Sequence, residues 1–495
     1  MKSHLPALVF LVLLSVIRLT TMASYGLSDD EAYYWEWSRN LAPAYYDQGP
    51  GVAYAIALGT ALFGHSELGV RFPALFIGII MSVLGYVLTF QIFQSRLAAF
   101  FALLFLTLAP LNFIGSLLMV HDTVMYLFWA LFIFTFVSYL RSNSNGTLYW
   151  CSIWLGLGLL SKHTTILLVP TIFVFLALRR DQLKIFRNKH LYLSGLLTFL
   201  VVSPLLYWNL NFDWAGVDAI INLPSASSRS RAFYQTLGEY VGGQIGIVNP
   251  VIFFFLAAVV IREIRRKSGD PARVFLATTT VFMLLFFALL SLKKTIQPNW
   301  TVCCYFGGLV LLGGAADVLW RKGKRVLITI CLGTSVLLNS LIVFPAAFVV
   351  VTRVLNIDYN RKALLTNRLV TGSEIGHELD QVRKKHPTAR IFANRYQAAA
   401  LMAFYLHDQP RTYCFNIDSR PNQFDYWESP DKYRNEDFIY VQFTHRDISP
   451  EIIGLFSSYK TYPPREVRRF NKKIRSYQFA YMEGFKGLPQ STSKH

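Results

Sequence analysis

Long apolar runs, each near the length that crosses a bilayer, recur through the first 350 of the 495 residues. A helix needs about twenty consecutive apolar residues to span the hydrocarbon core. We predict eleven spans, although ten or twelve fit the same pattern, near residues 5–22, 68–92, 97–118, 122–140, 148–160, 164–178, 191–208, 246–261, 272–291, 299–319 and 326–350. The short runs around 148–178 are joined by Ser161-Lys162-His163 and are expected to form a broken pair. The sequence therefore predicts an all-α polytopic membrane domain over residues 1–350.

The charged residues support this prediction by their number and by their positions. Only 16% of residues are charged, whereas a soluble chain carries about a quarter. The net charge is +19, but many Lys and Arg lie in short loops between apolar runs, where they set membrane topology. We therefore expect membrane lipid, and no nucleic acid, as a partner. The basic loops should face the cytoplasm, and the loops at 23–66 and 209–245 should face outward.

Residues 351–495 differ in character, because charge rises and apolar runs shorten to strand length. Strands are predicted near 390–395, 412–417 and 438–443, alternating with helices near 373–385, 396–406 and 450–458, and a hairpin near 466–471 and 475–482. This segment is predicted to be a small α/β domain. By the parity of spans it lies on the outer, periplasmic side.

Three consecutive carboxylates, Asp29, Asp30 and Glu31, follow the first apolar run. Asp30, with Asp29 or Glu31, is a candidate general base, because a hydroxyl attacks better when a carboxylate takes its proton. Ser28 with Glu31 three residues later is also a capping box, and acids in a first turn are stabilised by the helix dipole. The spacing alone leaves a structural and a chemical role equally open.

Further candidates stand at the same expected face of the membrane. His121-Asp122 opens an apolar run and is either an N-cap with a chance histidine or a second acid that binds a divalent metal or the acceptor. Lys162 and Arg71 lie at outward-facing ends of spans. A lysine there often only snorkels, but a phosphate between these two cations would neutralise both.

Several motifs resemble one known family. They are Asp30-Glu31-Ala32-Tyr33-Tyr34-Trp35, Tyr45-Tyr46-Asp47-Gln48-Gly49-Pro50, Ser66-Glu67-Leu68-Gly69-Val70-Arg71, Leu160-Ser161-Lys162, Gly243-Gln244, Asn299-Trp300 and Arg420-Pro421-Asn422-Gln423-Phe424-Asp425. The chain is similar to bacterial glycosyltransferases of the dolichyl-phosphate-mannose–protein mannosyltransferase superfamily. Within that superfamily it resembles the lipid A aminoarabinose and lipopolysaccharide galacturonosyltransferases most.

The resemblance implies the C-type membrane glycosyltransferase fold, a polyprenyl-phosphate sugar donor and inversion at the anomeric carbon. It makes Asp30 the catalytic acid of the first loop, with Glu31 beside it, Asp122 the acid of the second loop, and Lys162 a donor-phosphate ligand. Further contacts to donor or acceptor are expected from Tyr33, Tyr34, Tyr46, Asp47 and His163. Two departures stand out. Gln48-Gly49-Pro50 replaces a common His-Pro-Pro, which clouds a metal site there, and His163 replaces a residue like Tyr.

We therefore expect an enzyme of the bacterial inner membrane that transfers a sugar to a lipid A, lipopolysaccharide or other envelope acceptor at the outer face. Two alternatives stay open on the sequence. One is a protein O-mannosyltransferase acting on Ser or Thr. The other is a flippase for lipid-linked sugars, which makes and breaks no bond and needs no acid in an outer loop.

Overall fold

The structure is a computed structural model that describes residues 4–221, 232–266, 269–357, 369–417 and 420–489. It divides into two compact units. Unit 1 comprises residues 1–20, 48–55 and 71–340, and unit 2 comprises residues 21–47, 56–70 and 341–495. Residues 222–231, the middle of the expected outer loop 209–245, lie outside the described residues.

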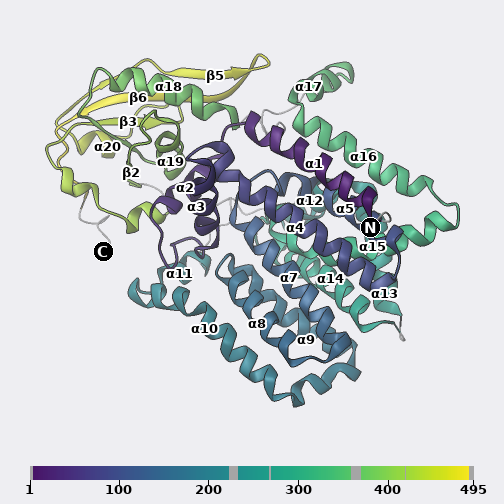
Figure 1. The fold of residues 1–495 in the computed structure, drawn as a ribbon. Coiled ribbons are helices and arrows are strands. Elements are labelled where there is room, and N and C mark those ends of the chain that lie inside the picture. Colours follow the sequence, from purple (N-terminus) through teal and green to yellow (C-terminus); the bar gives the residue numbers. More distant parts are fainter. Residues whose placement is uncertain (1–3, 222–231, 267–268, 358–368, 418–419, 490–495) are drawn as a thin grey trace. The chain divides into compact units, whose positions relative to one another are not determined.

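Unit 1 is built from helices, drawn from purple to teal in Figure 1. Its α-helices are α1 (Leu5–Ser24, which runs into unit 2), α4 (Glu67–Phe93), α5 (Arg96–Leu108), α6 (Pro110–Gly115), α7 (His121–Ser142), α8 (Asn145–Leu159), α9 (Leu168–Leu178), α10 (Lys189–Asn211), α11 (Ala215–Ile221), α12 (Phe233–Val248), α13 (Pro250–Arg265), α14 (Pro271–Ser291), α15 (Tyr305–Arg321) and α16 (Val326–Val343). Three 3₁₀ helices join them, η1 (His163–Leu167), η2 (Arg180–Arg187) and η3 (Pro298–Cys304). In Figure 1, α7, α8 and α10 lie side by side.

Seven helices of the described residues are long and apolar enough to cross a membrane, or eight if the bent pair α12–α13 is one span. The chain is thus a polytopic membrane protein, and by length and composition fewer of its described helices are full spans than the eleven predicted runs. The run at 97–118 breaks at Pro110 into α5 and α6, and α8 has only 15 residues. A helix of that length covers about 22 Å of a core about 30 Å thick. Hydropathy alone does not distinguish such short helices from complete spans.

The predicted span at 246–261 is also corrected, because a bend of 101° separates α12 from α13. Asn249 lies at the bend with φ of 93°, and Pro250 starts α13, where a missing N–H costs nothing. The Asn249 amide donates to the Cys331 carbonyl at 3.2 Å and to Ser335 Oγ at 2.9 Å. These bonds satisfy the Asn249 amide, which is fully buried, where an unpaired polar group is costly.

The segment Pro298–Arg321 forms the centre of unit 1. An apolar stretch of 18 residues within it is 89% buried, whereas the corresponding stretch of α10 is 11% buried. Small residues allow this burial. A Cβ at Gly313 would lie 2.6 Å from the Ala98 carbonyl, and one at Gly307 would lie 2.8 Å from the Leu276 carbonyl. Helices α5 and α14 therefore approach α15 closely, as helices with small residues do in membranes.

Unit 2 combines two early segments with the C-terminal part of the chain. Its helices are α2 (Asp29–Arg39), α3 (Gly51–Phe63, which begins in unit 1), α17 (Pro345–Val354), α18 (Thr371–Arg383), α19 (Tyr396–Tyr405), α20 (Pro450–Gly454), η6 (Gln423–Tyr426) and η7 (Pro430–Tyr433). Its strands are β1 (Arg390–Ala393), β2 (Thr412–Cys414), β3 (Phe438–Gln442), β4 (Ser458–Thr461), β5 (Arg465–Arg469) and β6 (Lys472–Glu483). Helix α3 was not expected within the outer loop.

The sheet confirms the predicted α/β character of the C-terminal segment. Its order is β2-β1-β3-β6-β4, with β5 paired to β6, and only β1 pairs in parallel, with β2 and with β3. One face buries a cluster of aromatic rings that includes Phe392, Phe415, Phe438 and Phe456. Helix α19 packs on β1, β2 and β3. Each face of the sheet is therefore covered, which explains why β3 is buried at all five positions.

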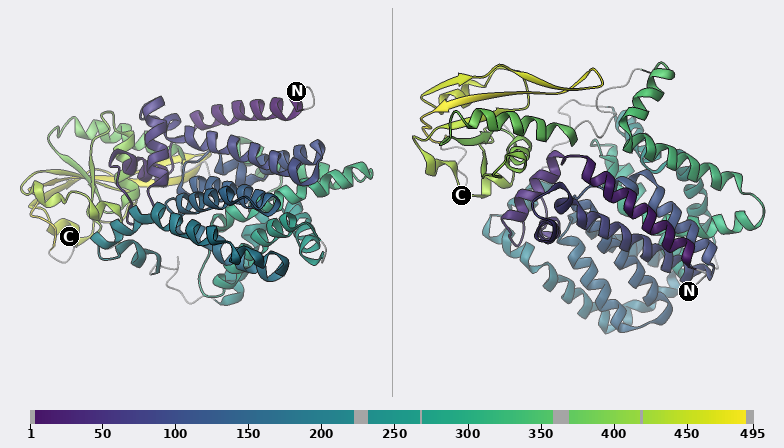
Figure 2. Two further views of the ribbon diagram at one scale, coloured as in Figure 1. Left: turned by 60° about the horizontal axis from the view of Figure 1, so that its bottom comes forward. Right: turned by 45° about the horizontal axis from the view of Figure 1, so that its top comes forward.

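The predicted late hairpin is formed by β5 and β6. Arg469 pairs with Lys472, which leaves a two-residue turn of Phe470 (φ 49°) and Asn471 (φ 59°). Two positive φ values are the mark of the tight turn that matches strand twist. Strand β6 pairs with β5 along its first half and with β3 and β4 along its second half. The hairpin consequently extends beyond the rest of the sheet (Figure 2).

Candidate active site

Unit 1 holds a buried ion pair between Lys162 and Asp122. The Lys162 Nζ donates to Asp122 Oδ1 at 2.5 Å, and the two residues are 5% and 8% exposed. Asp122 stands in the first turn of α7, and Lys162 precedes η1 in an extended conformation (φ −156°). The structure thus joins two candidates that are forty positions apart. The cation and the anion compensate each other, which a buried charge requires.

Two further side chains reach the other carboxylate oxygen of Asp122. Asn299 Nδ2 donates to Oδ2 at 3.3 Å, and His121 Nε2 lies 3.4 Å from the same oxygen. Asp122 is therefore held by two donors, Lys162 and Asn299, with the His121 imidazole beside it. Within the described ranges no three His, Cys, Asp or Glu side chains are grouped as a metal site. Binding of a divalent ion by His121 and Asp122 stays a prediction, and we derive no step through one.

Asn299 is held in place by a polar network around Gln244. The Gln244 Oε1 accepts hydrogen bonds from Thr301 Oγ1 at 2.7 Å and from the Tyr305 hydroxyl at 2.6 Å. Its Nε2 donates to the Pro298 carbonyl at 3.0 Å. Both polar atoms of the buried Gln244 side chain are therefore hydrogen-bonded, to residues of η3 and to Tyr305, which follows it. The network fixes the backbone that carries Asn299 toward Asp122.

The segment Gly49-Pro50-Gly51 packs directly on the backbone before Lys162. The Gly51 N–H donates to the Leu160 carbonyl at 3.1 Å. A Cβ at Gly49 would lie 2.1 Å from the same carbonyl oxygen, and one at Gly51 would lie 2.6 Å from Ser161 Oγ. Both glycines are therefore needed for this close approach. They hold the peptide that presents the lysine.

Two other candidates of unit 1 are placed less directly. Arg71, expected to share a phosphate with Lys162, lies on α4 and is only 1% exposed. His163 is half-buried and begins η1, next in the chain to Lys162. His163 is therefore next to the ion pair in the sequence. A phosphate shared by Arg71 and Lys162 stays a prediction.

In unit 2 the three consecutive carboxylates have different surroundings. Asp29 accepts from Arg475 Nη2 at 3.0 and 2.9 Å. Glu31 is fully buried and accepts from the Ser28 N–H at 3.0 Å, which completes the predicted capping box. Asp30 is exposed. Of the three acids, Asp30 is thus the one that is open to a reactant.

A hydrogen-bonded chain ties the first loop to the C-terminal segment within unit 2. The Tyr33 hydroxyl donates to Asp47 Oδ2 at 3.0 Å and accepts from the Gln423 N–H at 2.7 Å. Gln423 Oε1 accepts from the Tyr46 N–H at 2.7 Å. Burial raises the pKa of Asp47, while Arg420, 3.4 Å away, and the Tyr33 hydroxyl oppose that rise. Motifs almost 400 residues apart therefore form one rigid corner.

Aromatic rings pack around this corner. Tyr34 is 7% exposed and contacts Trp37 edge-on at 5.1 Å between centroids. The ring centroids of Tyr33 and Tyr396 lie 4.3 Å apart. Burial, and next the charge of Asp30, raise the pKa of Tyr396. The aromatic signature after the acids therefore serves first to fold α2 against α19.

Three residues of these networks escaped the sequence analysis as functional candidates, namely Asn299, Gln423 and Arg420. Each lay inside a motif of the resemblance, which was the available signal. The sequence did not show which side chain each of these residues contacts. A hydrogen bond such as that from Asn299 to Asp122 joins positions 177 residues apart, beyond the reach of any local pattern.

The fold and these contacts define a class: a polytopic membrane protein with a buried Asp–Lys pair in its helical unit and an α/β unit that includes an acidic loop. Residues 47–208 match the family model described as dolichyl-phosphate-mannose-protein mannosyltransferase. That range includes Asp47, Arg71, Asp122 and Lys162, and it begins after Asp30. The comparison confirms the resemblance to this superfamily that the motifs predicted.

Particular relatives agree. The lipid A galacturonosyltransferase RgtD of Rhizobium johnstonii is 25% identical over 327 residues, which make up 64% of this chain and 66% of that protein. Crystal structures of ArnT from Cupriavidus metallidurans, in the apo state and bound to undecaprenyl phosphate, both match with a TM-score of 0.65 at 16% identity, over 99% of each chain. The expected C-type glycosyltransferase fold is therefore confirmed.

Proposed function

We propose that this protein is an inverting membrane glycosyltransferase that moves a sugar from a polyprenyl-phosphate donor to a lipid A or other lipopolysaccharide-type acceptor. The enzyme works at the outer face of the bacterial inner membrane, with its α/β unit in the periplasm. The observation that carries the proposal is the Lys162–Asp122 pair, buried at 2.5 Å in a fold shared with an undecaprenyl-phosphate-binding protein. The likeness to a lipid A galacturonosyltransferase supports the acceptor class.

In the proposed reaction Lys162 is the ligand of the donor phosphate. Asp122 holds its ammonium group in a fixed position before the donor arrives, and Asn299 and His121 flank the other oxygen of that carboxylate. As the bond between the anomeric carbon and the phosphate oxygen breaks, negative charge grows on that oxygen. A preorganised cation stabilises this charge without rearrangement. Arg71 is the proposed second cation for the same phosphate.

The acceptor oxygen forms its bond to the anomeric carbon on the face opposite the departing phosphate, which inverts the configuration. Asp30 accepts the proton of the acceptor when it is a hydroxyl. Glu31 and Asp29 serve this role indirectly, since their bonds to Ser28 and Arg475 hold the first turn of α2. Tyr33, Tyr34, Tyr46 and Asp47 shape the acceptor side, and His163 contacts the donor.

The proposal is tested by replacing Asp30 with Asn in the full chain. Because Asp30 is exposed, the variant should insert and fold like the parent, and transfer should fall by roughly 100-fold or more. Mass spectrometry of lipid A, core oligosaccharide and envelope proteins, with and without the protein, identifies the acceptor. Transfer at the parent rate by the Asp30→Asn variant would refute the base. Modified Ser or Thr would indicate a protein acceptor, and donor movement without acceptor would indicate a flippase.

A further inference from the structure

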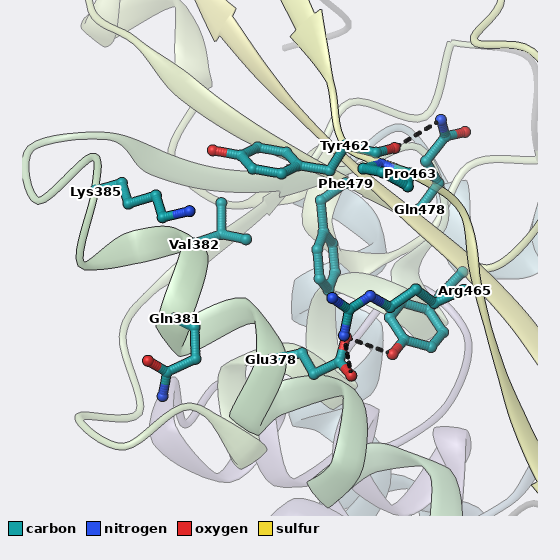
Figure 3. A pocket seen from close by; sticks show the side chains of 10 residues that line it. Glu378, Gln381, Val382, Lys385, Tyr462, Pro463, Arg465, Gln478 and Phe479 are labelled. Carbon is teal, nitrogen blue, oxygen red and sulfur yellow. Dashed lines mark hydrogen bonds and ion pairs between the residues drawn. The ribbon is translucent and has the colours of Figure 1, made fainter.

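A cavity of about 190 Å³ lies in unit 2, between helix α18 and the β5–β6 hairpin. Figure 3 shows its lining side chains converging from both elements. Val382 and Phe479 form an apolar floor with Tyr462, and Lys385 and Arg465 stand around them. The combination of aromatic surface with a few polar groups is typical of small-molecule sites. No part of the proposed transfer mechanism uses this cavity.

The aromatic wall of the cavity is fixed before any ligand binds. The Tyr462 N–H donates to the Phe479 carbonyl at 2.9 Å, and the Tyr462 carbonyl accepts from Gln478 Nε2 at 3.2 Å. Its hydroxyl lies 3.0 Å from His386 Nε2. Two bonds thus hold the Tyr462 backbone and one holds its ring, so little conformational entropy is lost when a ligand stacks on that ring.

The charges around the cavity leave one cation available. Glu378 accepts from Arg465 Nη1 at 2.6 Å and from the Tyr477 hydroxyl at 2.6 Å, so these groups satisfy one another (Figure 3). Lys385 is exposed, and in the described part of the chain its ammonium group makes no ion pair or hydrogen bond. The neighbouring segment 458–475 carries seven Lys or Arg and one Glu. Five of these cations pair with carboxylates, and the remaining positive charge attracts anions.

We propose that this cavity binds one sugar ring that carries a negative group. The volume is below the roughly 300–1,000 Å³ of sites for drug-sized ligands, so it suits a single ring rather than a longer saccharide. The C–H face of the sugar stacks on Tyr462 and Phe479, and its anionic group pairs with Lys385. The ligand's identity as part of the acceptor glycan rests on the proposed function. The site thereby makes Lys385 and Tyr462 specificity-determining residues for a charged acceptor.

The test measures binding to the full-length protein in nanodiscs by saturation-transfer NMR and titration. The probes are glucuronic acid and glucose 6-phosphate, with glucose as the uncharged control. Lys385→Gln should weaken both charged probes about tenfold, as expected for a lost charge-assisted contact, and leave glucose unchanged. Phe479→Leu should weaken all three. Lys384→Gln, one position earlier and outside the cavity lining, should change nothing.

The two charged probes separate the two sources of the negative group. A preference for glucuronic acid assigns the site to a uronic acid, and a preference for glucose 6-phosphate assigns it to a phosphorylated sugar. Failure of both charged probes to bind, or equal binding by the parent and Lys385→Gln, would overturn the proposal. Because these assays contain no donor, that result would leave the transfer reaction untouched, while a failed Asp30→Asn test would leave this site standing.

Discussion

The Lys162 ammonium group and the Asp122 carboxylate lie 2.5 Å apart, in residues that are both less than a tenth exposed. Taking two charges out of water costs several kcal/mol each, and their attraction, with the bond from Asn299 to Asp122, offsets that cost. Such a pair is seldom kept for stability alone, because well-packed apolar residues do as well. It is well suited to hold a cation ready for a phosphate.

Removing one member of this pair should be worse than removing both. Lys162→Met leaves the Asp122 charge buried without its cation, at a cost of roughly 3–5 kcal/mol. The double variant Lys162→Met with Asp122→Asn should recover much of that loss, although transfer is abolished in each. Thermal unfolding in detergent, analysed as a double-mutant cycle, measures the coupling. Additive effects would show that the two groups are independent.

Gly49→Ala should impair donor binding without touching a charged residue. The added Cβ would lie 2.1 Å from the Leu160 carbonyl, so the backbone that presents Lys162 must shift. We expect a higher KM for the lipid-linked donor and a lower thermal stability. Gly195→Ala in α10 is the matched control, because nothing lies within 4 Å of its new methyl group. Equal KM values for the two variants would contradict this role of Gly49.

The sequence predicted most of the local structure, since periodicity, capping and hydropathy act over a few residues. The capping box at Ser28, the hairpin of β5 and β6 and the three alternating strands of unit 2 are confirmed. The predictions that failed concern the length of some membrane helices and the continuity of the spans at 97–118 and 246–261. The bend at Asn249 depends on hydrogen bonds to Cys331 and Ser335, which no window around residue 249 contains.

The candidate site shows the same division. The residue types were predictable, because a chain of apolar runs has little reason to place Asp122 or Lys162 at their ends. Their pairing was not, and neither was the separation of Asp30 from its two neighbouring acids. That separation follows from Arg475, 446 positions away from Asp29. Asp29 is paired by a residue distant in the chain, whereas Glu31 is bonded locally to Ser28.

Tyr33→Phe should destabilise unit 2 although it removes a single oxygen. That hydroxyl bonds both Asp47 and the Gln423 N–H, and all these groups are largely buried. Each buried polar group left without a partner costs roughly 1–3 kcal/mol. Hydrogen exchange of the Gln423 amide, followed by mass spectrometry, should accelerate. Tyr459→Phe on the exposed strand β4 is the control and should exchange like the parent.

The Glu36 carboxyl should make unit 2 less stable as pH rises. Burial, opposed by Arg39 and Arg411, raises its pKa from 4.5 to about 7, and the residue is 4% exposed. The folded state therefore binds the proton more tightly than the unfolded state, so this group's contribution falls between pH 4.5 and 7, by about 3 kcal/mol at most. Glu36→Gln mimics the protonated form and should flatten that slope, whereas Glu451→Gln, at an exposed position, should keep it. Unfolding followed from pH 4.5 to 8 measures the difference, and parallel curves for the parent and Glu36→Gln would show that the carboxyl has the same pKa in the folded and unfolded states.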